Sequence, residues 1–167
     1  MNNCTDFKNK LLVKMDAHIE IKHMPKMYLA YVTCIGPQNL ERSYEKLIQW
    51  ATSLGLMGIH TKPVTMYHDS FKDTEYHKVW MSACLMLKEP VNTEGEIKMK
   101  SIDSGKYIVG RYEIGMDEFA KSWTELFGWM NDQGYRKADK EPFEIYYNNF
   151  KEHPEQKAII DLCIPIQ

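Results

Sequence analysis

Two short segments of the chain carry the residues best suited to chemistry, and both have the pattern of β-strands. They are residues 64–69 (VTMYHD) and 143–148 (FEIYYN). Because successive side chains of a strand point to opposite faces, Glu144 and Tyr146 share one face, and Tyr67 occupies the matching place in the other segment. A carboxylate among aromatic rings suits an organic cation, since each ring adds a cation–π attraction of about 0.5–2 kcal/mol. The sequence therefore predicts a cation site around Glu144.

A purely structural interpretation of the same residues stays open. Glu144 would then be a solvated side chain on an exposed strand face, because glutamate is seldom buried without a partner. Tyr67 and Tyr146 would pack within the sheet, and their matching positions favour that role as much as a functional one. The two interpretations differ in one measurable quantity, since burial would raise the pKa of Glu144 by disfavouring its ionised form.

The other reactive residue types show no local pattern that indicates a site. The six histidines include no HxH or HExxH spacing, so we expect no metal ion. No serine or cysteine lies in a local motif with histidine and aspartate, and no glycine-rich loop suits a phosphate. The sequence therefore predicts no cofactor. The four cysteines include no CxxC pair, and we expect reduced thiols in a cytoplasmic protein.

An internal repeat organises the elements that must position these residues. When the chain is shifted by 79 positions, residues 28–87 align without a gap with residues 107–166. Identical glycines and tryptophans recur in this alignment, and hydrophobic patterning alone seldom produces such matches. The identities include Gly36 with Gly115, Trp50 with Trp129, Gly55 with Gly134, Pro63 with Pro142, Tyr67 with Tyr146 and Cys84 with Cys163. The chain therefore contains two copies of one unit.

Each copy is predicted to fold in the order β-α-β-β. A strand rich in β-branched and aromatic residues ends at a glycine, a helix with one apolar face follows, and two strands come after a proline. The predicted elements are a strand at 27–36, a helix at 40–54 and strands at 64–69 and 79–87, then a strand at 106–115, a helix at 119–130 and strands at 143–148 and 158–166.

Two such units predict an α+β fold in which duplicated βαββ units, related by a pseudo-twofold axis, form an antiparallel sheet. One helix for every three strands covers only one face, so both helices are expected on the same side. Val64, Met66, Phe143 and Ile145 are expected to pack under the helices. This arrangement leaves Glu144 facing a ligand cleft on the opposite, concave side of the sheet.

The length of 167 residues indicates a single domain. Residues 1–16 are expected to form an N-terminal extension and residues 17–167 a ligand-binding domain. Within that domain we expect repeat one at about 17–88 and repeat two at about 96–167, joined by a solvated loop.

Composition and charge exclude several classes of function. The chain is 44% hydrophobic and 26% charged, as expected for a globular core-former. Its formal net charge of −2 gives no bulk attraction for phosphate backbones, so direct nucleic-acid binding is not expected. No apolar run approaches the roughly 18 residues of a membrane span, and the N-terminus lacks the apolar region of a secretory signal.

Three stretches of the sequence resemble the GyrI-like small-molecule-binding domains, which have the SOUL/GyrI-type fold. They are residues 95–123 (GEIKMKSIDSGKYIVGRYEIGMDEFAKSW), 140–149 (KEPFEIYYNN) and 161–166 (DLCIPI), and the resemblance extends from about residue 17 to the end. The family fold is a pseudo-symmetric pair of βαββ units. Similar domains form the effector-binding halves of AraC-type and MerR-type activators. This chain has only about 16 residues before its first strand, too few for a helix-turn-helix pair.

The resemblance implies a binding site for amphipathic cations, in which the acid of the FEIY motif is Glu144 and Tyr146 lies beside it. Tyr67, Tyr112, Trp80 and Trp123 become candidates for the pocket wall by position. Trp123 also lies on the apolar stripe of its predicted helix, which favours a core role.

Two further functions are implied by the resemblance. Stand-alone members of the family inhibit DNA gyrase, so gyrase is a candidate partner beside a small-molecule ligand. Other members hydrolyse cyclopropane-bearing genotoxins, and in that case Glu144 would orient or deprotonate water. Because no second acid has an obvious place facing the site, binding without turnover is the favoured expectation, and enzymatic activity stays open.

Overall fold

The computed structural model describes residues 18–70 and 73–167, so the predicted extension at 1–16 lies outside the described residues. The strands are β1 (His18–Met24), β2 (Met27–Ile35), β3 (Lys62–Tyr67), β4 (Trp80–Leu87), β5 (Lys98–Ile102), β6 (Gly105–Ile114), β7 (Phe143–Tyr146) and β8 (Ala158–Pro165). The α-helices are α2 (Leu40–Ser53) and α3 (Phe119–Asp132). Four short 3₁₀ turns are η1 (Pro37–Asn39), η2 (Tyr76–Lys78), η3 (Met116–Glu118) and η4 (Phe150–Glu152).

All eight strands form one antiparallel sheet in the order β1-β6-β8-β7-β3-β4-β2-β5. The central pair joins the two copies, because β3 of the first copy lies beside β7 of the second, with Thr65 opposite Glu144. The predicted α+β architecture of duplicated βαββ units is confirmed. Each copy also has a leading strand, β1 or β5, that the repeat alignment did not indicate.

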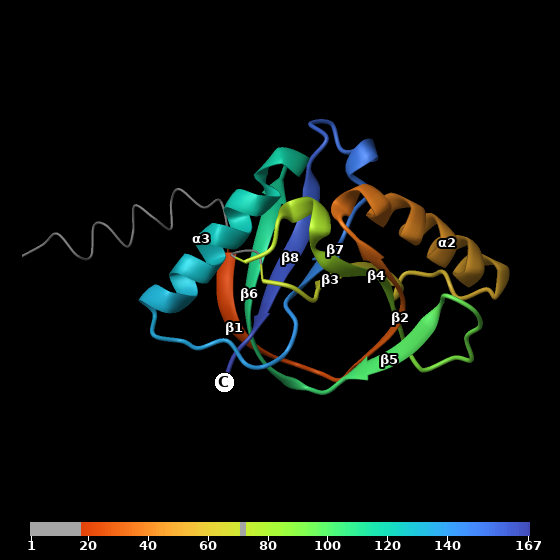
Figure 1. The fold of residues 1–167 in the computed structure, drawn as a ribbon, viewed down its shortest axis with the longest axis horizontal. Helices are drawn as coiled ribbons and strands as arrows, with labels where there is room; N and C mark the ends of the chain where they lie inside the picture. Colours follow the sequence, from red (N-terminus) through yellow and green to blue (C-terminus); the bar gives the residue numbers. More distant parts are fainter. Residues whose placement is uncertain (1–17, 71–72) are drawn as a thin grey trace, which may run out of the picture.

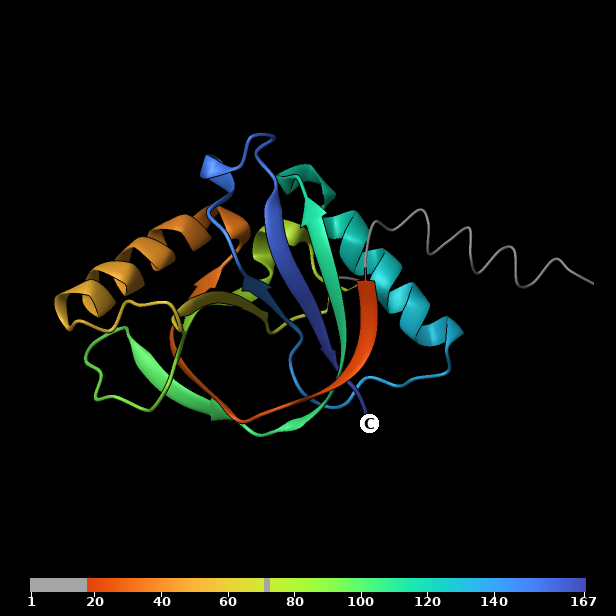
Figure 2. The ribbon, with the colours of Figure 1, turned by 180° about the vertical axis from the view of Figure 1, so that it is seen from behind.

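The two leading strands close the concave side of the sheet. Strand β1 continues into β2, and β5 continues into β6, so each pair forms one bent ribbon. The ribbons pair in a single register, since Met24 lies opposite Gly105 in one ladder and Met27 lies opposite Ile102 in the next. Figures 1 and 2 show these ribbons crossing below the other strands and completing a ring. The sheet is therefore nearly a barrel.

Both helices lie outside this ring, one over each half of the sheet, as the two views in Figures 1 and 2 show. Helix α2 packs on β2 and β4, where Leu47 and Ala51 meet Ala30 and Leu85. Helix α3 packs on β6 and β8 through residues that include Leu126. The expectation that both helices lie on the same side is confirmed. Strands β3 and β7 lie between the helices, at the centre of the sheet.

The alternation predicted for the central strands is confirmed, but the two faces are exchanged. Val64, Met66, Phe143 and Ile145 pack inside the ring, with residues such as Leu29, and not under the helices. The physical reason is the closure by the bent ribbons, which removes water from the concave side and makes it an apolar interior. The opposite set of side chains, which includes Glu144, therefore lies on the helix side, and the predicted concave cleft is filled by this core.

The two copies differ by one residue in the first strand of the repeat. Leu29 lies opposite Met86, and Tyr107 lies opposite Pro165. Met86 and Pro165 are 79 positions apart, as in the ungapped alignment, whereas Leu29 and Tyr107 are 78 apart. Positions in β2 therefore match positions 78 residues later in β6, and Gly115 is the additional residue before the second helix. Elsewhere the offset of 79 holds, because β3 pairs with β4 in the register that β7 keeps with β8.

Among residues 18–70 and 73–167, no helix combines the length and the apolar character needed to cross a membrane.

Candidate functional site

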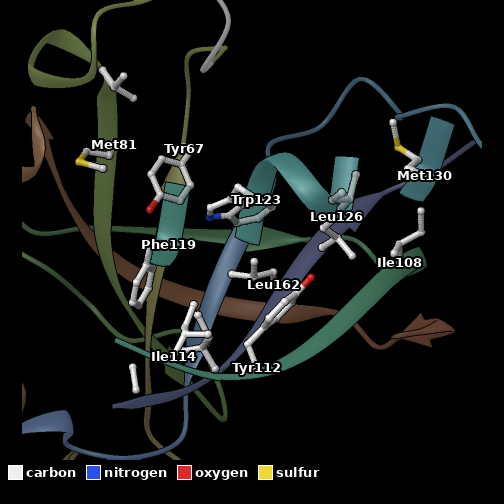
Figure 3. Close-up of a cluster of buried hydrophobic side chains, with 14 of the residues drawn as sticks. Tyr67, Met81, Ile108, Tyr112, Ile114, Phe119, Trp123, Leu126, Met130 and Leu162 are labelled. Atoms are coloured by element: carbon white, nitrogen blue, oxygen red, sulfur yellow. The ribbon is translucent and has the colours of Figure 1, made fainter. Parts of the chain in front are cut away.

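The centre of the helix side is the Glu144 carboxylate, which has 0% exposed surface. Its Oε1 atom accepts hydrogen bonds from the Tyr67 hydroxyl at 2.6 Å and from the Trp123 indole N–H at 2.7 Å. Its Oε2 atom accepts a hydrogen bond from the Tyr146 hydroxyl at 2.5 Å. Figure 3 shows the indole nitrogen of Trp123 on the side of its ring that faces Tyr67. Three of the aromatic residues proposed from the sequence therefore meet at the predicted acid.

Strand pairing and one helix bring these side chains together. Tyr67 ends β3, Glu144 and Tyr146 share a face of β7, and the pairing of β3 with β7 sets the distance between them. Trp123 comes from the second turn of α3, and its ring packs edge-on against Tyr67, with 5.8 Å between ring centroids. Trp123 thus serves both the apolar core and the acid.

A hydrogen-bonded chain extends the site to the other helix. The Tyr146 hydroxyl lies 3.0 Å from the Thr65 hydroxyl, which lies 2.9 Å from the hydroxyl of Tyr44 in α2. Sequence reasoning missed Tyr44 because it lies on the apolar stripe of its helix. The repeat alignment contained the signal, since Tyr44 is the counterpart of Trp123. The two helices and the two central strands therefore share one polar network.

The Glu144 carboxylate has neutral hydrogen-bond donors and no cationic partner among residues 18–70 and 73–167. Burial raises the pKa of Glu144, and the three hydrogen bonds from Tyr146, Tyr67 and Trp123 oppose that rise. Burial and the nearby carboxylate also raise the pKa of Tyr67 and of Tyr146 well above the usual value, so both phenols stay protonated as donors. Such a site holds a negative charge that an external cation or a proton can neutralise.

The turn η2 lies between the two helices in Figure 1, above the centre of the sheet. Its first residue, Tyr76, is exposed, and the pKa of its phenol is raised by burial and by the charge of Glu144. Tyr146, on the strand below, is partly exposed. Two tyrosines that interact with Glu144, Tyr76 and Tyr146, therefore have surface exposed to solvent.

Two other residues proposed for the pocket wall lie apart from these contacts. Tyr112 is buried beside α3, and its hydroxyl has no hydrogen-bond partner among the described residues. In Figure 3 its side chain points toward Leu126 and away from the indole nitrogen. Trp80 is half exposed at the start of β4, where its backbone N–H donates to Asp69. Neither residue is among the hydrogen-bond donors to Glu144. Their part in a ligand site stays a prediction.

Two further acids, Asp161 and Glu113, have partners of their own. Asp161 forms an ion pair with Arg111, and Glu113 lies 2.6 Å from His153. Within the described part of the chain, no three histidine, cysteine, aspartate or glutamate residues are grouped to hold a metal ion.

Comparisons with known proteins identify relatives of this chain. The DNA gyrase inhibitor of Escherichia coli (strain K12) is 29% identical over 137 residues, covering 78% of this chain and 85% of that protein. A DNA gyrase inhibitor of Citrobacter koseri is 24% identical over 155 residues, covering 89% of this chain and 97% of the relative.

Solved structures share the fold at lower identity. The C-terminal domain of EcmrR superposes with a TM-score of 0.73 at 18% identity, over 90% of this chain and 98% of that domain. EcmrR in its DNA complex gives a TM-score of 0.78 at 19% identity, and this chain spans 64% of its length. SAV2435 bound to tetraphenylphosphonium gives 0.57 at 12% identity, over 90% of this chain and 94% of that one.

The family model of the GyrI-like small molecule binding domain matches residues 17–167, which includes both copies of the repeat and every residue of the Glu144 site. The chain therefore belongs to the GyrI-like small-molecule-binding domain family.

Proposed function

We propose that this protein binds amphipathic organic cations, with Glu144 as the anionic centre and Tyr67, Tyr146 and Trp123 as aromatic walls. The observation that carries the proposal is the buried carboxylate, which has only neutral donors among the described residues. A buried charge without an opposite charge is costly, so a cation that replaces neutral donors gains more here than at the surface. The aromatic rings add apolar contact and cation–π attraction.

Ligand entry requires movement of the side chains around Glu144, because Glu144 is fully buried. Among the aromatic side chains that interact with it, Tyr76 is exposed and Tyr146 is partly exposed. Tyr146 keeps a second partner in Thr65, so its hydroxyl can leave the carboxylate without losing every hydrogen bond. A bulky aromatic cation then occupies the space that the displaced ring leaves.

The test compares ligands of matched shape and opposite charge. Tetraphenylphosphonium is the cation, and tetraphenylborate is its anionic counterpart. Titration calorimetry, with quenching of tryptophan fluorescence as a second readout, should show binding of the cation and much weaker binding of the anion. Glu144→Gln should weaken cation binding by about 2 kcal/mol, roughly thirtyfold in Kd, because the variant keeps the shape and loses the charge.

The matched control is Glu45→Gln, which removes the same charge from an exposed position of α2. It should leave the affinity for tetraphenylphosphonium unchanged. Equal binding of the two ligands by the parent protein, or equal effects of the two substitutions, would contradict the role of Glu144.

Inhibition of DNA gyrase is a second candidate function, favoured by the names of the curated relatives and by the 85% of the Escherichia coli protein that the alignment covers. Adding the purified protein to a supercoiling assay should slow the introduction of supercoils. Unchanged supercoiling at a large excess of protein over gyrase would remove this candidate. Hydrolysis at Glu144 stays an alternative, and the absence of turnover of a cyclopropane-bearing electrophile would argue against it.

A further inference from the structure

A second polar cluster lies on the inner face of the sheet, opposite the face of Glu144. The Thr33 hydroxyl in β2 lies 3.0 Å from the Ser82 hydroxyl in β4. Ser82 Oγ lies 2.7 Å from Nε2 of His68, which directly follows β3. The other imidazole nitrogen, Nδ1, lies 3.5 Å from Oε1 of Glu141, which precedes β7. Four residues from separate parts of the chain therefore form one continuous row.

The hydrogen bonds of this row are consistent with a single direction of proton donation. Thr33 donates to Ser82, Ser82 donates to Nε2 of His68, and the Nδ1–H group of His68 points to Glu141. Hydroxyl, imidazole and carboxylate in this order are the parts of a nucleophile with a general base and an orienting acid. The local sequence did not reveal it, because no two of the four residues are neighbours in the chain.

The second copy has different chemistry at the same four positions. Arg111 matches Thr33, Asp161 matches Ser82, Tyr147 matches His68, and Lys62 matches Glu141 across the two copies. Arg111 and Asp161 form an ion pair with two hydrogen bonds, and the Tyr147 hydroxyl donates to Asp161 at 2.8 Å.

The charges of Arg111 and Lys62 also lie over the Tyr147 ring, at 4.1 and 5.4 Å from its centroid. This arrangement joins strands and offers no free nucleophile. The row of Thr33, Ser82, His68 and Glu141, called the relay below, is therefore matched in the second copy by an ion-paired cluster that links strands.

The imidazole of His68 is suited to act as a base. Burial lowers its pKa, the positive charge of Lys100 lowers it further, and Glu141 and Asp69 oppose the shift. His68 is half buried and Ser82 is fully buried, so the inner part of the relay is shielded from water. A neutral imidazole can accept the proton that a hydroxyl releases when it attacks an electrophile.

The exposed end of the relay, Thr33, borders a groove. Thr33 is exposed and lines a surface groove of about 470 Å³ beside the start of α2. Three cationic side chains, those of Arg42, Lys46 and Lys98, line the same groove, against one acid, Glu96. Strand β5 pairs with β2 only as far as Tyr31, so within residues 18–70 and 73–167 the main chain of β2 near Thr33 has no strand on that side. Thr33, cationic side chains and an open strand edge therefore lie next to one another, with the Thr33 hydroxyl directed toward Ser82 on the inner face.

We propose that Thr33 is an acyl-accepting nucleophile, activated through Ser82, His68 and Glu141, for small esters that carry a negative charge. Thr33 Oγ1 attacks the ester carbonyl and forms a new C–O bond. Its proton passes to Ser82 as the Ser82 proton passes to Nε2 of His68. The C–O bond to the leaving alcohol breaks, and the alkoxide takes the proton back from the imidazole through Ser82.

The products of this step are the alcohol and an acylated Thr33, with no change in oxidation state. Backbone N–H groups along the open edge of β2 are the donors available to the transient oxyanion, and the groove cations attract the anionic end of the ester. Acylation consumes no water, whereas deacylation does, and the buried Ser82 and half-buried His68 are shielded from it, so we expect one rapid turnover followed by slow deacylation.

The test uses the p-nitrophenyl monoester of succinic acid, with p-nitrophenyl acetate as its uncharged counterpart. The parent protein should release about one equivalent of p-nitrophenolate in a burst, faster with the succinate ester. Peptide mass spectrometry should find the acyl group on Thr33. The burst rate should fall as the pH decreases through the titration of His68, below the usual range for histidine.

Variants at Thr33 separate chemistry from folding, because the side chain is exposed. Thr33→Val keeps the shape and should abolish the burst, whereas Thr33→Ser keeps the hydroxyl and should retain it. Ser82→Ala and His68→Gln should slow the burst at least tenfold. His153→Gln, which replaces another half-buried histidine that contacts an acid, is the matched control and should leave the burst unchanged.

A burst that persists in Thr33→Val, an acyl group found on lysines or on Ser82 instead of Thr33, or no burst in the folded parent protein would overturn the assignment. None of these outcomes bears on cation binding at Glu144, which lies on the other face of the sheet.

Discussion

The two copies of the repeat place matching side chains around the helix side of the sheet, yet only one copy carries a charge there. In the first copy Tyr44 contacts Thr65 at 2.9 Å, and in the second Trp123 donates to Glu144 at 2.7 Å. The contacts between copies match as well, since Tyr67 donates to Glu144 and Tyr146 contacts Thr65.

This comparison shows how a duplicated unit acquires a polar centre. The symmetric framework supplies aromatic donors from both sides, and one substitution, a glutamate in place of a threonine, supplies the charge. Three predictions test whether the difference between Thr65 and Glu144 determines the stability of this polar centre.

The largest effect is expected when symmetry is restored with a second acid. In Thr65→Glu, a buried carboxylate would face Glu144 across the central strands, where the two positions are opposite each other. We expect the free energy of unfolding at pH 7 to fall by about 3–5 kcal/mol, with a smaller loss at acidic pH, where one carboxyl is protonated. Urea unfolding at the two pH values measures this.

Thr65→Gln adds a similar volume without charge and serves as the control for that measurement. If it destabilises the protein as much as Thr65→Glu at both pH values, then packing and not charge repulsion limits this position.

A smaller effect is expected from loss of a donor on each side. Trp123→Phe removes the indole N–H from a buried acid and should lower the free energy of unfolding by about 2 kcal/mol, because bonds to charged groups contribute about 1.5–3 kcal/mol. Tyr44→Phe removes a hydroxyl from a neutral partner that retains Tyr146, and should cost about 1 kcal/mol or less. Thermal unfolding of both variants gives the ranking, and a reversed order would show that Glu144 is not the more demanding acceptor.

The smallest effect is a pH dependence of the free energy of unfolding, which Glu144 can produce and its counterpart Thr65 cannot. Because the folded protein raises the pKa of Glu144, it binds that proton more tightly than the unfolded chain does. Stability should therefore decrease as the pH rises from the ordinary glutamate pKa through the raised value, with a slope of at most about 1.4 kcal/mol per pH unit.

Glu144→Gln should lose this contribution, so its stability relative to the parent should increase across that pH window and stay constant above it. Parallel stability curves for the two proteins would indicate that Glu144 titrates normally.

Much of this fold could be predicted from the sequence. The repeat fixed the number and order of the main elements, and alternation placed Glu144, Tyr67 and Tyr146 on a common face. The face itself was assigned wrongly, because nothing in the local pattern shows that the leading strands β1 and β5 close the concave side. Apolar side chains such as Val64 then fill a space that an open sheet would leave as a cleft.

The candidate site was only partly accessible to sequence reasoning. Tyr44 and Thr33 were missed for different reasons, although each gains its partner from a distant strand. Tyr44 occupies a helical stripe that normally indicates core packing. The ungapped alignment does not match Thr33 with Arg111, and this match appears only when the strand register shows the one-residue shift between β2 and β6. Such contacts depend on register, which a periodic pattern does not determine.

The single ladder formed by the two bent ribbons also determines how the molecule comes apart. Each ribbon begins against one copy and ends against the other, so neither half has a complete set of strand partners by itself. A polypeptide ending between the copies would expose an unpaired backbone edge and would gain most by associating with a second molecule like itself. Unfolding should accordingly be all-or-none, and the repeat has the form expected of two identical subunits that became joined in one chain.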